Sequence, residues 1–97
     1  MRLTMDQYPR PSPGIVGQLL NDEAVLLRPE AGKVSVLNEV AARIWQLADG
    51  TRSIRQIAVL VASEYQVELP QAEADTLEFV EMLIQKGMLV AGDHSQA

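Results

Sequence analysis

The spacing of apolar residues changes at Asn38, and this change divides the chain into a strand-forming part and a helix-forming part. Before Asn38, short apolar runs at residues 15–20, 24–28 and 33–37 are separated by turn residues. In the third run, Val34 and Val36 point to one side and their neighbours to the other. After Asn38, apolar residues recur every three or four positions, which is typical of amphipathic helices. The sequence therefore predicts a three-stranded antiparallel meander followed by helices.

Three helices are predicted from their boundary residues. Asn38 is a good N-cap for a first helix, which ends at Asp49-Gly50. Ser53 and Gln56 form a capping box at the start of a second helix, over residues 54–65. The third helix begins at Pro70 and ends near Lys86, before a glycine. Residues 88–90 either return as a short strand or pack under the helices. The expected fold is a small α+β domain of winged-helix type.

One domain accounts for the 97 residues, because a second hydrophobic core could not be closed in such a short chain. Pro9, Pro11 and Pro13 favour extended backbone, so residues 1–14 are expected to be a flexible arm. The domain itself is predicted over residues 15–91, and residues 92–97 are expected to fray.

Composition argues against several classes of function. Thirteen acidic residues against eight basic ones give a net charge of −5, which disfavours binding to nucleic acid. The chain has no cysteine, and its one histidine, His94, lies near the end, so neither catalysis nor a metal or other cofactor is expected. The longest apolar run, residues 57–62, is far shorter than the roughly 20 residues of a membrane span. With no secretion signal, a cytoplasmic protein is expected.

The third strand and the third helix together suggest a peptide-binding site. Lys33–Leu37 would be an edge strand, and after Lys33 it has neither the charge nor the proline that usually protects an edge. Beside the helix stripe that docks on the core lies a second stripe, which is either buried as well or lines a groove for an extended peptide. The candidate peptide-binding residues are Lys33, Val34, Ser35, Val36, Leu37, Ala72, Thr76, Phe79, Leu83 and Lys86. A homodimer through the same edge remains an alternative, as part of a structural or regulatory role.

Several motifs resemble those of the PqqD-like family, the recognition domains for ribosomally made, post-translationally modified peptides. The resemblance covers roughly residues 16–90 and is clearest in three stretches, namely 26–32, 36–45 and 49–54. Its most specific element is Leu37-Asn38 followed by Asp49-Gly50. A separate chain of this size with a proline-rich start is most similar to the stand-alone recognition proteins of lasso-peptide pathways.

The resemblance implies a three-stranded sheet followed by three helices, with no catalytic residues. It also implies that the leader of a precursor peptide pairs antiparallel with Lys33–Leu37 and lies beside the third helix. The partners implied are the precursor leader and the enzymes to which it is delivered, a leader peptidase and an ATP-dependent macrolactam synthetase.

Overall fold

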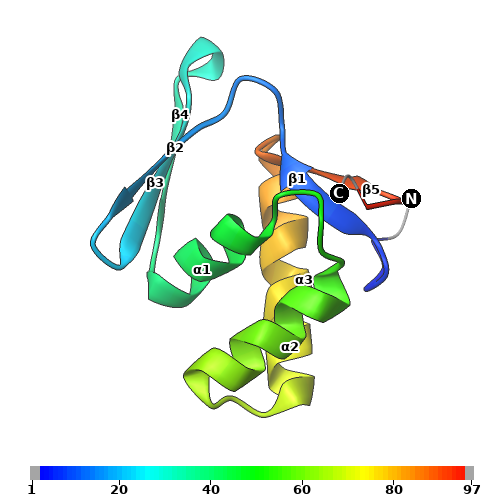
Figure 1. The fold of residues 1–97 in the computed structure, drawn as a ribbon. Coiled ribbons are helices and arrows are strands. Elements are labelled where there is room, and N and C mark those ends of the chain that lie inside the picture. The colour runs from blue at the N-terminus through cyan, green and yellow to red at the C-terminus, as the bar shows by residue number, and fades with distance from the viewer. Residues whose placement is uncertain (1–2, 96–97) are drawn as a thin grey trace.

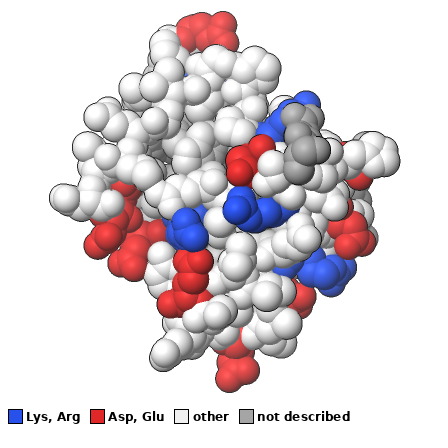
Figure 2. All heavy atoms as spheres, viewed as in Figure 1, with Lys and Arg blue, Asp and Glu red and all other residues white. Residues whose placement is uncertain are grey.

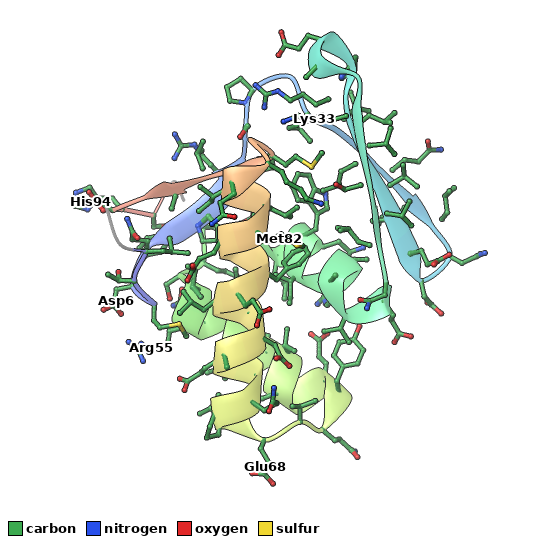
Figure 3. The ribbon with its side chains drawn as sticks, turned by 180° about the vertical axis from the view of Figure 1, so that it is seen from behind. Asp6, Lys33, Arg55, Glu68, Met82 and His94 are labelled. Carbon is green, nitrogen blue, oxygen red and sulfur yellow. The ribbon has the colours of Figure 1, made fainter. Side chains whose placement is uncertain are left out.

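The computed structural model describes residues 3–95, which form three helices and two antiparallel sheets (Figure 1). In chain order the elements are β1 (Tyr8–Pro11), β2 (Val16–Leu20), β3 (Glu23–Arg28), a 3-10 turn (Pro29–Ala31), β4 (Lys33–Leu37), α1 (Glu39–Leu47), α2 (Ile54–Tyr65), α3 (Leu69–Gln85) and β5 (Leu89–Gly92). The two sheets lie on opposite sides of the C-terminal end of α3 (Figures 1 and 3). The predicted α+β class and the order of strands and helices are confirmed.

The three-stranded sheet has the order β2-β3-β4 and is covered on one face by α1. Ala24, Leu26 and Leu37 point inward and are buried in the core. The indole of Trp45 on α1 lies so close to Gly17 on β2 that an added Cβ would stand 2.9 Å from its Nε1. Trp45 therefore fills the space between α1 and the sheet.

The helices begin where their caps predict. The Asn38 side chain accepts a hydrogen bond from the Ala41 amide, and the capping box of Ser53 and Gln56 is formed. No side chain caps α3, but Pro70 occupies its first turn, where a missing N–H costs nothing. Shortly after the last residue of α3, Gly87 has a φ of 74°. This left-handed conformation favours glycine and ends the helix.

The proline-rich segment is not a free arm where the structure describes it, so this prediction is wrong for Tyr8–Pro11. These residues pair antiparallel with β5, Tyr8 opposite Gly92 and Pro11 opposite Leu89. The Pro9 carbonyl accepts a hydrogen bond from the Gly50 amide (2.9 Å) and thus faces away from β5. Because an antiparallel strand bonds its partner through alternate residues, Pro9 and Pro11 occupy positions that need no amide hydrogen.

The residues before β1 hold the start of α2. The Ile54 and Arg55 amides donate to the carbonyls of Gln7 and Met5, at 3.0 and 2.9 Å. Together with the Ser53 cap on the Gln56 amide, these bonds satisfy three amides that a helix start leaves without partners. The folded unit therefore begins well before residue 15. Residues 1–2 of the expected arm and 96–97 of the expected tail lie outside the described residues, and Asp93 and His94 are exposed.

Candidate functional site

β4 is an edge of its sheet, as predicted, and its apolar side chains are divided between two faces. Ser35 and Leu37 point inward and are buried. Val34 and Val36 point outward and are 60% and 67% exposed. Figure 2 shows that the part of the surface over this sheet carries few charged side chains. The strand thus combines an uncharged outer surface with an open edge.

The turn between β2 and β3 determines which amides of β4 face that edge. Only two residues, Asn21 and Asp22, join Leu20 to its partner Glu23, and Asn21 has a φ of 59°. This is the geometry of a type II′ hairpin, in which the flanking residues are hydrogen-bonded to each other. Alternation then directs the amides of Ala24, Leu26 and Arg28 toward β4. Their partners on β4 point back at β3, so the N–H and C=O groups of Val34 and Val36 point away from the sheet.

β2 forms a second open edge, which the sequence analysis did not consider. By the same alternation, the amides of Gly17 and Leu19 point away from β3. The two edges differ in what lies beside them. Figure 3 shows β4 as the strand of this sheet nearest to α3, with Met82 on the part of the helix beside the intervening space. Only the β4 edge therefore faces a helix across this space.

The flank of α3 near β4 presents a shallow hollow with both apolar and acidic walls. Its apolar wall consists of Phe79, which is partly buried against the core, and Met82, which is 41% exposed. The hollow as a whole is lined by Asp75, Glu78, Phe79, Glu81, Met82 and Gln85. We call β4 together with this flank of α3 the β4–α3 site.

Three predicted site residues on α3 do not belong to this surface. Ala72, Thr76 and Leu83 are almost completely buried, so the prediction that they contact a peptide is wrong. The helix packs on both α2 and β5, and this wide contact centres on the stripe that was assigned to the groove. Relative to Leu83, Phe79 lies ~40° and Met82 ~100° around the helix, toward the open flank, at ~100° per residue.

Met82, Asp75 and Glu78 are surface residues of the site that were not predicted from the sequence. One signal was available, since Met82 follows Phe79 by three residues and extends the apolar stripe to one side. Of the predicted residues, the structure brings together Phe79 and Lys86 on α3 and Lys33 at the start of β4.

Charged groups at the two ends of the β4–α3 site have opposite signs. Lys33 lies near the C-terminal end of α3, where Lys86 also lies (Figure 3). Asp75, Glu78 and Glu81 belong to the hollow itself. Within residues 3–95, none of these five residues takes part in an ion pair.

Other charged side chains form ion pairs and hydrogen bonds that hold the fold together. The Arg43 guanidinium on α1 donates to both carboxylate oxygens of Glu64 on α2, at 2.8 and 2.9 Å, and thereby lowers the pKa of Glu64. The hydroxyl of Thr51 donates to Asp49 and lowers the pKa of that carboxyl. Arg28 on β3 donates to the Gly87 carbonyl at the end of α3 and so connects the sheet to this helix.

Metal-ligating side chains do not gather into a site in the part of the chain that the structure describes. Within residues 3–95, no three His, Cys, Asp or Glu side chains are grouped so that they could hold a metal ion. His94 is exposed and lies on the β1–β5 side of the molecule (Figure 3). None of the helices in this range has the length and apolar character that a membrane span requires.

Comparison with known proteins identifies the family. The model of a family described as coenzyme PQQ synthesis protein D (PqqD) matches residues 23–89, from the start of β3 to the first residue of β5. The chain belongs to the PqqD family. The predicted family is thereby confirmed, and the segment that matches the PqqD model includes both β4 and the hollowed flank of α3.

The chain is similar to a protein named for binding PqqA and to two solved structures that contain a leader peptide. A PqqA binding protein of Xanthomonas euvesicatoria pv. vesicatoria (strain 85-10) is 43% identical over 68 residues, which cover 70% of this chain and 72% of that protein. The structure of TbiB1 in complex with the TbiA(β) leader peptide has a TM-score of 0.77 at 31% identity, covering 82% of this chain and 93% of that one. A lasso peptide synthetase B1 complexed with the leader peptide has a TM-score of 0.76 at 36% identity, covering 86% and 98%.

Proposed function

We propose that this protein binds the leader region of a ribosomally synthesised precursor peptide without catalysing a reaction on it. The leader is held in extended form as a fourth strand on β4, and its side chains on the inner face meet the hollow of α3. The observation that carries the proposal is the outward direction of the Val34 and Val36 amides beside an apolar wall. Such an arrangement fits β-strand addition, in which the backbone gives affinity and pockets for alternate side chains give specificity.

The inner face of the added strand continues the face on which Ser35 and Leu37 lie. Side chains on that face project toward α3, where Phe79 and Met82 offer apolar contact. An anchor of this kind contributes about 2 kcal/mol when it is well buried. Backbone pairing on a five-residue strand gives little discrimination between sequences by itself, so we assign specificity to the flank of α3.

Two kinds of relative support leader binding and differ in the precursor. Both structural neighbours are bound to leader peptides, and one of them is a lasso peptide synthetase B1, which favours delivery to a leader peptidase and a macrolactam synthetase. The relative from Xanthomonas is named for binding PqqA, which favours a PqqA-like precursor. On both alternatives the protein acts in the cytoplasm, where the precursor is made. Titration with a lasso leader and with PqqA, each labelled, distinguishes them.

Removing one amide from each open edge tests the proposal. In Val36→Pro, an amide on the β4 edge is lost, and whichever of these two leaders binds more tightly should bind at least tenfold more weakly. In the matched control Leu19→Pro, an amide on the β2 edge is lost, and affinity should stay within about twofold. Circular dichroism establishes that both variants are folded. Unchanged affinity in folded Val36→Pro contradicts strand addition to β4.

A homodimer through β4 is the second candidate, because the same uncharged edge can pair with its own copy. Sedimentation of the free protein tests it. A dimer that persists on dilution and dissociates in Val36→Pro would favour this alternative, whereas a monomer favours leader binding.

A further inference from the structure

The β4–α3 site changes its charge from one end to the other. Its lysines, Lys33 and Lys86, lie where β4 begins and α3 ends, and its carboxylates lie farther back along the helix (Figure 3). From Asp75 to Lys86 the helix rises about 16 Å at 1.5 Å per residue. The five residues of β4 span about 17 Å at roughly 3.4 Å each. One extended segment on β4 can therefore reach both the acidic and the basic end.

The carboxylates of this flank differ from their neighbour on the other flank of α3. Glu73 lies on that other flank, where one of its oxygens is 3.9 Å from the Arg55 guanidinium. Glu78 and Glu81 line the hollow and form no ion pair within residues 3–95. Lys33 and Lys86 are exposed and likewise without an ion pair in this range. Within residues 3–95, the β4–α3 site thus has unpaired charges of opposite sign at its two ends.

We infer that the β4–α3 site selects peptides by the direction of their charge: basic side chains before the apolar anchors and acidic side chains after them. The inference rests on the proposed function, with the peptide antiparallel to β4. Because β4 and α3 run in opposite directions (Figure 3), such a peptide runs parallel to α3. Its N-terminal part lies beside Asp75 and Glu78, and its C-terminal part arrives at Lys33 and Lys86.

The expected preference is modest and sensitive to salt. Exposed ion pairs each contribute little, because water and ions screen them. With two favourable contacts at each end, a peptide of the correct direction should bind about threefold to tenfold more tightly than its reverse, or ~0.7–1.4 kcal/mol. The difference should nearly vanish in about 1 M salt, where the Debye length is about 3 Å.

Two fluorescein-labelled peptides of identical composition test the inference by fluorescence anisotropy. Both have the same alternating apolar centre; one begins with two lysines and ends with two glutamates, and the other has these ends exchanged. The full-length protein is compared with Lys33→Gln/Lys86→Gln, in which the preference should shrink. The matched control Arg10→Gln/Arg52→Gln removes the same charge away from the site and should retain it. The leader that binds more tightly in the titration with a lasso leader and with PqqA is titrated in parallel.

The outcomes separate this inference from the proposed function. Tighter binding of the peptide that begins with lysine, lost in salt and reduced in the double lysine variant, supports the charge direction. If the leader binds but the two probes bind equally, in reverse order or not at all, the inference is overturned and leader binding stands. If the leader itself does not bind, the proposed function fails, and the inference with it.

Discussion

The two sheets of this protein are both small and antiparallel, yet one is closed and the other open. In the β1–β5 sheet, Pro9 is buried, its carbonyl is bonded to Gly50, and the Ser12 amide donates to the Met88 carbonyl. In the three-stranded sheet, every residue of β2 is exposed, and β4 offers amides at its free edge. Prolines and backbone bonds protect the first sheet, and nothing comparable protects β4. The proline-rich segment, which was expected to be a flexible arm, is therefore part of the folded structure. The regular strand β4 is the one whose edge remains available to a ligand.

Deleting residues 1–11 should have the largest effect, because it removes β1 and two of the backbone hydrogen bonds at the start of α2. The loss exposes Met88 and Leu89, which are 1% exposed, and leaves the Ile54 and Arg55 amides without partners. We expect the free energy of unfolding in urea to fall by about 3 kcal/mol or more.

A deletion at the other end of the chain is the control for the β1 deletion. Removing residues 94–97 should change the free energy of unfolding by less than about 0.5 kcal/mol, because His94 and Ser95 are exposed. A β1 deletion as mild as this control would show that the first sheet is an appendage and would remove the contrast between the two sheets.

On the open side, shortening the apolar wall should weaken leader binding. Phe79→Ala is expected to cost about 2 kcal/mol of binding free energy and Met82→Ala about 1 kcal/mol, measured by calorimetric titration. Met82→Ala is the cleaner test, since Phe79 also packs against the core and its loss affects stability. Val59→Ala, at an exposed apolar position of α2, is the control. Equal affinities of Met82→Ala and this control would place the ligand elsewhere.

A substitution on the buried side of α3 should change the free energy of unfolding. The hydroxyl of Thr76 is fully buried and has no hydrogen-bond partner, so Thr76→Val should raise the free energy of unfolding by about 1 kcal/mol. Thr51→Val should do the opposite, because the Thr51 hydroxyl donates to Asp49. If Thr76→Val instead lowers the free energy of unfolding, the Thr76 hydroxyl has a hydrogen-bond partner, and α3 is less tightly buried on this side.

The smallest effect is expected from the ion pair between α1 and α2. Folding lowers the pKa of Glu64 from its ordinary value of 4.5, mainly because Arg43 donates to it. The stabilisation is therefore present above pH 4.5 and is lost as the pH falls through the pKa of the folded state. Both partners are partly exposed, so the contribution is below about 1 kcal/mol. Arg43→Met should flatten the acid limb of the thermal stability profile, and an unchanged limb would contradict this assignment.

Local patterns predicted much of the fold. Asn38, Ser53 and Gly87 each act on residues close to them in the chain. The caps and ends of the helices could therefore be predicted from the sequence. The alternation of Val34 and Val36 likewise predicted a strand, and the order of the meander correctly predicted its place at an edge. The docking of residues 5–9 was not predictable in this way, because their carbonyls bond to amides more than 40 positions away. Backbone groups are the same in every residue, so such bonds leave no pattern.

The site was predicted in part for a related reason. A helical wheel shows that α3 has two apolar stripes, but the elements that cover each stripe are decided by tertiary packing. Ala72, Thr76 and Leu83 are buried in the core because α3 packs against α2 and β5, whereas Phe79 lies at the edge of this buried contact. Met82 was missed because Phe79 is its one apolar neighbour on a flank of α3 that is otherwise polar, where a single added apolar side chain carries little information.

Amide hydrogen exchange, followed by NMR with and without the synthetic leader peptide, tests the central claim most directly. The Val34 and Val36 amides should exchange fast in the free protein and at least tenfold more slowly in the complex, while those of Gly17 and Leu19 stay unchanged. Protection of the β2 amides instead, or no new protection at β4 under saturating peptide, would contradict strand addition to this edge.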